Sequence, residues 1–365
     1  MVDVVVVGGG PAGLITSLYV KGLDVVLFEE HSRVGYPKHC AGFVSRYTAA
    51  RISRIASSRV LDHRYRVLSF YTPRGRYIME FKTPLIYHVN RPLFEEKLLD
   101  KVLAKGIDVY LGVKAKPSTS PSLIRVGNGE VRARYIVASD GAHSIFRKAL
   151  YRSYNDYLIG VQYVYRTSGL DDDVIHIIYD NYTPDFFQWI APIDTDKVLL
   201  GFATRKYTVH PEVIASKSLK KIGITPGSRI EVFGGLIPRD KPLDNPVIEY
   251  RDTSVVFIGD SVPHIKPYTG GGLSLITTLA PLLGDSISRN RLLDYKRVHR
   301  ALKYRLLVEY SLTSFFEKNN YWIPADIVNK LYRFKLLEPV DYDNHYRLVV
   351  KSLPLTLYFL LSTMR

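Results

Sequence analysis

The stretch VDVVVVGGGPAG, residues 2–13, decides the fold of this chain. Its mostly apolar first half predicts a strand of a parallel sheet that is buried on both faces, rather than a secretion signal. The three glycines and the proline predict a sharp turn into a helix that runs to Lys21. A second strand over 24–28 completes a β-α-β unit of about thirty residues.

The glycines of this turn have the spacing of a dinucleotide-binding motif. Gly8 permits the sharp turn, Gly10 lets a pyrophosphate approach the backbone, and Gly13 lets the helix pack close to the sheet. The free N–H groups at the start of the helix favour phosphate. We expect the dinucleotide contacts of this turn to be Gly8, Gly10, Ala12 and Gly13.

An acidic residue follows at the distance that ribose binding requires. Glu29 lies 21 residues after Gly8, at the end of the second strand, and we expect it to accept hydrogen bonds from ribose hydroxyls, with Glu30 as the fallback. Two acids and no arginine at this point disfavour a 2′-phosphate, so we do not expect NADP here.

Composition narrows the class of protein. The 365 residues suit two joined domains, and a single cysteine, Cys40, excludes disulfides within the chain. Ten scattered histidines show no ligand spacing, so we expect no metal, and one cysteine fits a reducing cytosol. The net charge of +15 favours phosphorylated or lipid partners over nucleic acid. The apolar run Leu353 to Leu361 is too short to span a bilayer.

The rest of the chain predicts a mixed α/β (α+β) fold. Hairpins are expected over 64–81 and 123–138, short β-rich runs fill 157–250, and a strand over 253–259 precedes a helix over 273–286. We therefore expect a Rossmann-like domain with an inserted antiparallel or mixed β-sheet domain for the substrate, and a helical C-terminal region. The expected boundaries are 1–65, 85–155 and 250–290 for the first domain, 66–84 and 156–249 for the second, and 291–365 for the tail.

Three later segments extend the dinucleotide pattern. VNRP, residues 89–92, leads into a helix, and ASDGAHS, residues 138–144, follows a strand. VVFIGD, residues 255–260, precedes KPYTGGG, residues 266–272. Together with the N-terminal turn, these segments resemble the FAD-dependent family that contains para-hydroxybenzoate hydroxylase, and within it the geranylgeranyl reductases, including the archaeal digeranylgeranylglycerophospholipid reductases. The resemblance covers most of residues 1–290.

The resemblance implies that FAD is the cofactor, that Arg91 contacts it and that Asp260 binds its ribityl chain. Three glycines before a helix let the backbone lie against a flat ring. The helix N-terminus then faces the N1 and C2 carbonyl side of the flavin, where the reduced form carries negative charge. The further expected cofactor contacts are Cys40, Ala41, Asp140, Gly141, Gly259, Pro267, Gly270, Gly271 and Gly272.

Two segments bear on the substrate. GYPKHCAG, residues 35–42, is similar to the cysteine-bearing loop of geranylgeranyl reductases, which places Cys40 near the flavin to position substrate or assist protonation. The alternative for Cys40 is a small buried apolar residue. His39 and His264 flank the flavin motifs and are candidate proton donors by position, with structural histidines as the alternative.

The second segment is FQWIAP, residues 187–192, which resembles the YxWxFP motif that lines the lipid cavity of these reductases. Phenylalanine replaces the tyrosine and alanine replaces the phenylalanine. The segment also loosely resembles the WxWxIP motif of flavin-dependent halogenases, and a plain core tryptophan is a further alternative. We expect substrate contacts from Phe187, Trp189 and Pro192.

The resemblance implies an oxidoreductase that reduces carbon–carbon double bonds in isoprenoid chains of lipids or prenyl diphosphates. A monooxygenase or halogenase of the same fold, or a flavin electron-transfer protein, is the alternative. The electron donor stays open among reduced ferredoxin, NAD(P)H and others. We expect a cytoplasmic protein. The basic, apolar-striped tail, residues 293–316, either packs over the substrate domain or docks on an anionic inner membrane face.

Overall fold

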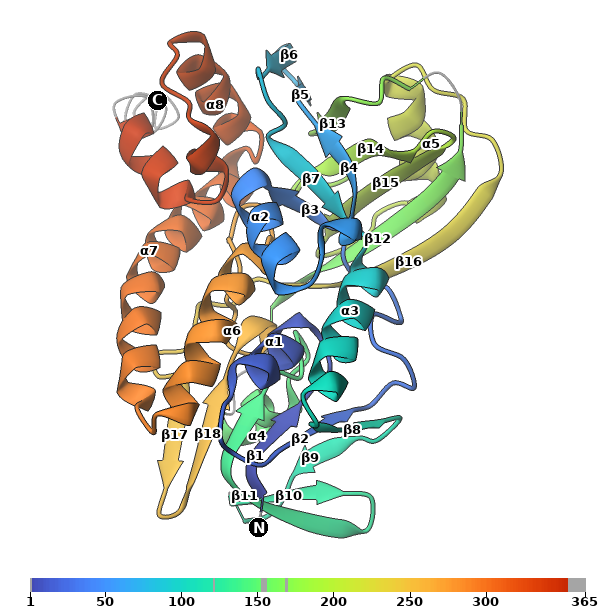
Figure 1. Cartoon of the computed structure of the whole chain (residues 1–365). Coiled ribbons are helices and arrows are strands. Elements are labelled where there is room, and N and C mark those ends of the chain that lie inside the picture. Colours follow the sequence, from blue (N-terminus) through green and yellow to red (C-terminus); the bar gives the residue numbers. More distant parts are fainter. Residues whose placement is uncertain (1, 121, 152–155, 168–169, 354–365) are drawn as a thin grey trace.

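The computed structural model describes residues 2–120, 122–151, 156–167 and 170–353 (Figure 1). An eight-stranded sheet has the order β17-β18-β11-β1-β2-β8, with β10 and β9 added beside β11. Five of these strands, from β8 to β18, run parallel, so the N-terminal strand is buried as its apolar sequence predicts. The strands of this sheet are β1 (Val2–Val7), β2 (Val25–Glu29), β8 (Asp108–Leu111), β9 (Ala115–Pro117), β10 (Leu123–Val126), β11 (Gly129–Ala138), β17 (Val247–Tyr250) and β18 (Thr253–Phe257).

Helices cover one face of this sheet and form the largest core with it. Helix α1 (Pro11–Tyr19) lies between α3 (Arg91–Ala104) and α6 (Leu273–Ser288). The contact between α1 and α6 is close, because a Cβ added at Gly284 would lie 2.7 Å from the carbonyl oxygen of Thr16. On the other face, α4 (Ile145–Tyr151) packs with β9 and β10.

A seven-stranded sheet has the order β16-β12-β15-β14-β13-β5-β6, and all its pairs are antiparallel except β13 with β5. Helix α5 (Pro211–Lys221) covers one of its faces. Its strands are β5 (Val67–Thr72), β6 (Gly75–Glu80), β12 (Tyr157–Arg166), β13 (Val174–Ile178), β14 (Gln188–Asp194), β15 (Lys197–Thr204) and β16 (Arg229–Pro238). A small third sheet holds β3 (Phe43–Ser45), β4 (Leu61–Tyr65) and β7 (Ile86–Val89), beside α2 (Arg46–Ile55) and a 3-10 turn (Ser58–Val60).

The C-terminal region follows both sheets. Helix α7 (Leu292–Asn319) runs along the side of the molecule and is followed by α8 (Ile323–Arg333) and a 3-10 turn (Pro339–Tyr342) (Figure 1). The expectation that this helix packs over the substrate domain is wrong for its first half. Leu292 and Tyr295 enter the core beside α6, and Phe316 near the other end enters the core of the seven-stranded sheet.

The predicted fold class, the β-α-β unit and both hairpins are confirmed. The strands β5 and β6 join the seven-stranded sheet, although β4 and β7 on either side of them do not. The domain boundaries given above stay a proposal. Residues 354–361 of the apolar C-terminal run lie outside the described residues. Within the described chain, no helix is both long and apolar enough to cross a membrane.

Candidate functional site

The turn between β1 and α1 is so tight that only glycine fits at two positions. Gly8 has a φ of +102°, and a Cβ there would lie 2.5 Å from the carbonyl oxygen of Ser139. A Cβ at Gly13 would lie 2.0 Å from the carbonyl oxygen of Gly8. Ser139 also donates from its hydroxyl to the Val7 carbonyl, so the ends of β1 and β11 are fastened together. Helix α1 therefore begins directly at the carboxyl edge of the sheet.

Gly10 is different, because an added Cβ would meet no atom within 4 Å. It precedes α1 with a φ of −76°, no side chain caps the helix, and the first turn holds no acidic residue. The first N–H groups of α1 are therefore free for an anion beside an open backbone surface. Ala12 lies on the side of α1 that faces Gly259, since a Cβ at Gly259 would come within 3.0 Å of the Ala12 methyl group.

Glu29 at the end of β2 is buried and faces the same turn. Its carboxylate accepts hydrogen bonds from the backbone N–H of Gly9, at 2.6 Å, and of His31, at 2.8 Å. Oε1 also lies 2.7 Å from Nδ1 of His31, so Oε2, which accepts from Gly9, is the oxygen that keeps a lone pair for a ribose hydroxyl. The fallback, Glu30, is exposed and pairs with Lys114, so the geometry favours Glu29.

Two aspartates at neighbouring strand ends have different environments. Asp140 accepts hydrogen bonds from the Ser144 hydroxyl, at 2.6 Å, and from the Phe146 backbone N–H, at 3.2 Å. It thereby caps α4, and burial raises its pKa despite these bonds. The carboxylate thus has a structural task, whereas the adjacent Gly141, with a φ of +74° and no atom near an added Cβ, is open to a ligand.

Asp260 follows β18 and has no hydrogen-bond partner for its carboxylate in the described part of the chain. Burial raises the pKa of Asp260 to about 6, although Arg91 and Arg147 favour the charged form. Its Oδ1 would lie 3.3 Å from a Cβ at Gly272, the residue before α6. This helix start also has no side-chain cap. Asp260 is partly exposed, so this acceptor and the free helix N-terminus beside it are both accessible to an outside group.

The loop of residues 35–42, here named the bridging loop, is fixed against the helix that Arg91 begins. A Cβ at Gly35 would lie 2.7 Å from the Cα of Pro92, and a Cβ at Gly42 would lie 2.4 Å from the Val89 carbonyl oxygen. Both glycines have positive φ angles. The bridging loop therefore holds Cys40 and Ala41 beside the start of α3.

Arg91 connects this loop to the rest of the site. Its guanidinium pairs with Glu95 one helical turn further on. Burial alone would lower the pKa of Arg91, but the Glu95 carboxylate and the Cys40 side chain outweigh it, and the pKa is raised. Arg91 is therefore a permanent positive charge that lies close to Cys40, which is exposed, and to Asp260.

His39 joins the bridging loop to the second sheet. Its carbonyl accepts a hydrogen bond from Gln162 of β12, at 3.0 Å, and its Cβ would lie 2.8 Å from a Cβ at Gly235 of β16. Burial and the nearby Arg91 lower the pKa of His39. The imidazole is therefore neutral near pH 7, and its backbone has a clear structural role.

His264 is fully buried, and the structure does not favour it as a proton donor. Its Nε2 lies 2.9 Å from Nδ1 of His299 on α7, whose Nε2 lies 2.8 Å from the Leu243 carbonyl oxygen. Burial lowers the pKa of His264 well below its usual value. The loop directs this side chain toward the tail, which the position of His264 in the sequence could not reveal.

Aromatic side chains from the seven-stranded sheet and the tail meet at the loop of residues 259–272. Phe187 lies 6.4 Å from Tyr268 of this loop, measured between ring centres, and Trp189 packs flat over Gly201, where a Cβ would collide with its ring. Pro192 lies further along β14, where its carbonyl accepts a hydrogen bond from Tyr65. We name the aromatic wall as Tyr179, Phe186, Phe187, Trp189, Tyr268 and Tyr321.

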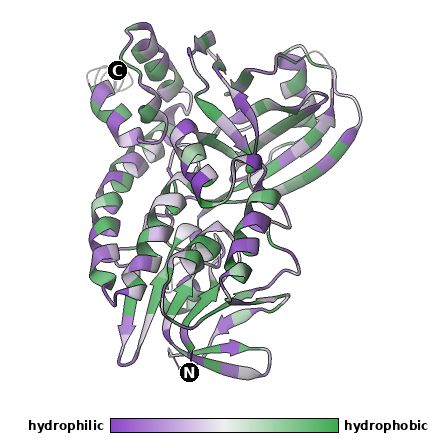
Figure 2. Ribbon diagram, viewed as in Figure 1, coloured by the Kyte–Doolittle hydropathy of each residue, from purple (hydrophilic) through white to green (hydrophobic). Residues whose placement is uncertain are grey.

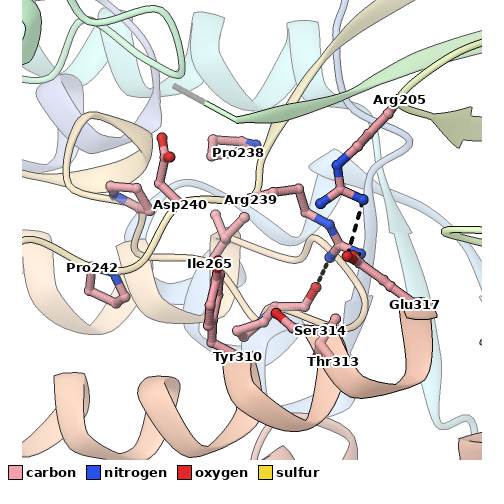
Figure 3. Close-up of a pocket in the computed structure, with 12 residues that line it drawn as sticks. Arg205, Pro238, Arg239, Asp240, Pro242, Ile265, Tyr310, Thr313, Ser314 and Glu317 are labelled. Carbon is pink, nitrogen blue, oxygen red and sulfur yellow. Dashed lines mark hydrogen bonds and ion pairs between the residues drawn. The ribbon is translucent and has the colours of Figure 1, made fainter. Parts of the chain in front are cut away.

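A small pocket opens beside this wall, between α7, the end of β16 and the 259–272 loop (Figure 3). Arg239 reaches across it and donates to the Pro267 carbonyl and to Glu317. Arg205 also pairs with Glu317 (Figure 3). Because carboxylates surround both arginines, this pocket is not an anion site.

Sequence reasoning missed four residues that hold the 259–272 loop: Lys266, Tyr268, Arg239 and Tyr321. Tyr268 donates to the Tyr321 carbonyl at 2.8 Å, Tyr321 donates back to the Tyr268 carbonyl at 2.5 Å, and their rings stack at 4.6 Å. Lys266 and Tyr268 flank Pro267 in the quoted KPYTGGG segment, so they could have been noticed there. Arg239 and Tyr321 gave no signal because their partners are far away in the chain.

The residues present fit FAD. Gly10 and the start of α1 offer an open cradle for a pyrophosphate, and Glu29 accepts at the ribose position. Asp260 supplies a partly exposed acceptor without a hydrogen-bond partner in the described chain, and the start of α6 offers free N–H groups for the ring. Within the described chain, no cluster of side chains has the composition of a metal site.

The sequence and the fold are similar to those of known proteins. Residues 1–181 match the model of the FAD binding domain. Digeranylgeranylglycerophospholipid reductase 2 of Methanopyrus kandleri is 26% identical over 307 residues, which cover 78% of this chain and 76% of that protein. A geranylgeranyl bacteriochlorophyll reductase-like protein of Thermoplasma acidophilum has a TM-score of 0.74 at 19% identity, covering 96% of this chain and 98% of that one. A flavin-dependent brominase, solved as a triple mutant, has a TM-score of 0.66 at 17% identity, covering 97% and 100%.

The FAD-binding domain, the relatives named as reductases and the fold define a flavoprotein oxidoreductase. Within this class, the sequence relatives distinguish the reductases from the halogenases, since the similarity to the brominase extends only to the fold. The chain carries an FAD-binding domain and is similar in sequence and fold to the geranylgeranyl reductases among the FAD-dependent oxidoreductases.

Gly10→Ala tests whether Gly10 and the start of α1 bind the pyrophosphate. Nothing lies near the added methyl group, and the φ of −76° suits alanine. The free energy of unfolding of the apoprotein should therefore change by less than about 0.5 kcal/mol. The affinity for FAD should fall tenfold or more, because the methyl group occupies the phosphate approach. Thermal unfolding of the apoprotein and fluorescence titration with FAD measure the two effects. Gly13→Ala is the contrast, since it should destabilise the apoprotein itself.

Asp260→Asn tests how much the desolvated, unpaired carboxylate of Asp260 lowers the stability of the apoprotein. Because the folded-state pKa is raised to about 6, the folded protein prefers the protonated acid, so the wild-type apoprotein loses stability as pH rises from about 4 to 6. Above pH 6 the variant should therefore be more stable than the wild type by roughly 1–3 kcal/mol, and equal to it near pH 3. Denaturant unfolding of both apoproteins at pH 4 and 7.5 measures this. A variant that is less stable at pH 7.5 would contradict the assignment.

Proposed function

We propose that this protein reduces carbon–carbon double bonds in isoprenoid chains of lipids or prenyl diphosphates. One observation carries the proposal: the aromatic wall meets the loop that presents the flavin ring. A Cβ at Gly270 would lie 2.8 Å from Ile237 and 3.7 Å from Phe186. A ring seated on this loop would therefore face an apolar surface from the substrate sheet, as an uncharged hydrocarbon chain requires.

Bound FAD, once reduced, supplies the hydride. The side chains of this protein must orient the double bond and exclude water and oxygen, and we assign that task to Phe187 and Trp189 of the aromatic wall. Pro192 extends the same strand. We also propose that the cofactor contacts expected from the sequence apply, with Glu29 preferred over Glu30 and with Asp140 acting by capping α4.

Cys40 is our candidate for handling the substrate or the proton. It is exposed on the bridging loop beside the permanent charge of Arg91, where a thiol can approach a bound ligand. His39 is a weaker candidate, because desolvation and Arg91 lower its pKa and its backbone joins the bridging loop to the seven-stranded sheet. His264 is the weakest, since the tail covers it completely.

A contact with an anionic membrane is supported by the outer side of α7. Leu293, Tyr304 and Val308 are exposed and lie on one face, since 11 and 4 residues are close to whole numbers of helical turns. Arg297 and Arg300 are exposed between them on that face. Figure 2 shows hydrophobic and hydrophilic residues mixed along α7. Such a stripe suits a shallow interfacial contact that would bring the enzyme to its lipid.

Anaerobic reoxidation tests the function. The FAD-loaded protein, reduced with dithionite, should be reoxidised by an unsaturated archaeal phospholipid or geranylgeranyl diphosphate, and mass spectrometry should show product heavier by two hydrogens per reduced bond. Phe187→Ala should slow this step about tenfold or more, because the substrate loses its orienting surface. Phe334→Ala, at an exposed site on the tail, is the matched control and should leave the rate unchanged.

Failure of the lipids to reoxidise the flavin would contradict the proposal. Rapid reoxidation by oxygen with a hydroxylated or halogenated product would then indicate a monooxygenase or halogenase. Fast exchange of electrons with a protein, without turnover of any lipid, would indicate an electron-transfer protein.

Co-sedimentation with vesicles tests the membrane contact. The protein should bind vesicles that contain anionic phospholipid and release them at high salt, because basic residues contribute much of the attraction. Leu293→Glu should weaken binding about tenfold. Val213→Glu, which places the same charge at an exposed apolar site on α5, should not. Equal loss in both variants would contradict a contact through α7.

A further inference from the structure

A buried lysine lies behind the glycine turn that precedes α6. The Nζ of Lys266 donates to the Tyr342 carbonyl at 3.0 Å and lies 4.8 Å from the centre of the Tyr342 ring. It lies 3.7 Å from Oδ1 of Asp343, which has no hydrogen-bond partner in the described chain. The other oxygen of Asp343 is engaged by the hydroxyls of Ser45 and Thr48.

Charged groups from three other segments surround this lysine. Glu309 of α7 is buried, and burial raises its pKa to about 7 although Lys266 opposes the shift. His345 lies 3.8 Å from Glu309, and burial lowers its pKa well below the usual value, so it is neutral. Arg51 of α2 adds a second positive charge 4.0 Å from Asp343. The cluster therefore holds two basic side chains, Lys266 and Arg51, against the carboxyl groups of Asp343 and Glu309, and burial lowers the pKa of both bases.

Lys266 also touches the turn itself. Its Cε would lie 2.9 Å from a Cβ at Gly271, and its Nζ 3.5 Å. The backbone N–H of Lys266 donates to the Gly271 carbonyl, and its own carbonyl accepts from Gly270. The ammonium is therefore fixed just beneath the backbone that a flavin ring would contact. Burying an incompletely balanced cation is costly unless a negative charge arrives nearby.

We propose that Lys266 is a positioning residue whose charge, held by the tail through Tyr342 and Asp343, stabilises the reduced flavin relative to the oxidised flavin. The proposal rests on the proposed function in one respect, namely that FAD binds with its ring on the turn of residues 270–272. Reduction adds negative charge at the N1 side of the ring, which faces this turn and the start of α6. The lysine charge acts there through the glycine backbone in a poorly solvated environment.

The reduction potential of the bound flavin tests this proposal. Lys266→Met keeps the length of the side chain and removes its charge, so reduced FAD should bind about tenfold more weakly relative to oxidised FAD. For a two-electron couple, this tenfold change corresponds to a potential about 30 mV lower. Equilibration with reference dyes measures the potential, and titration with oxidised FAD measures affinity separately. Lys220→Met, on the outer side of α5, removes the same charge at an exposed site and should leave the potential unchanged.

Asp343→Asn should shift the reduction potential of the bound flavin in the direction opposite to Lys266→Met. It keeps an oxygen for Ser45 and Thr48 but removes the negative charge beside Lys266, so the reduced form should be favoured about threefold. Lys266→Arg should restore most of the wild-type potential. If Lys266→Met does not fold, the Asp343→Asn shift decides: a raised potential supports the proposal and an unchanged one overturns it.

The measurements distinguish failure of the proposed function from failure of the Lys266 proposal alone. A wild-type protein that does not bind FAD would overturn the proposed function and this inference together. A wild-type protein that binds FAD and reduces lipid, with a potential that Lys266→Met leaves unchanged, would overturn this inference alone. Equal weakening of oxidised and reduced FAD would show that the lysine only supports the shape of the loop, and would also overturn it.

Discussion

The contact between Gly13 and the carbonyl of Gly8 is the constraint on which the rest of the site depends. A Cβ at Gly13 would lie 2.0 Å from that oxygen, so the start of α1 leaves no room for any side chain against β1. Ser139 ties the end of β11 to the same turn, and β18 lies next to β11. The ends of β1, β11 and β18, which come from distant parts of the chain, therefore meet where α1 begins. The loops that follow these three strands lie at one site.

The 259–272 loop then depends on both sheets and on the tail. Lys266 bonds to the segment after α8, the Pro267 carbonyl accepts from Arg239 at the end of β16, and Tyr268 is paired with Tyr321. Three consecutive residues are thus held by three different elements. If the flavin ring binds on this loop, as proposed above, binding of the cofactor is coupled to the packing of the substrate sheet and of the tail against the loop.

Local patterns in the sequence predicted the local parts of this structure. The turn at Gly8 and the hairpin at 123–138 depend on neighbours in the chain, and both are confirmed. The roles of Asp140 and Asp260 could not be separated, since both follow a strand, and only the fold shows that Ser144 and a helix N-terminus occupy the first. The sequence also left His264 open between a proton donor and a structural histidine, because its partner, His299, lies 35 residues away.

Two incompletely satisfied charges of opposite sign remain on either side of one glycine turn. Asp260 lies near Gly272 with no hydrogen-bond partner in the described chain, and Lys266 lies against Gly271 with one carboxylate at 3.7 Å. Each reduces the stability of the empty protein, because burial penalises the charged forms of both. A ligand with hydroxyls on one side and a ring that gains negative charge on the other relieves both costs at once. Under the proposals above, Asp260 and Lys266 weaken the apoprotein and favour the holoprotein, and the positive charge of Lys266 favours it most when the flavin is reduced.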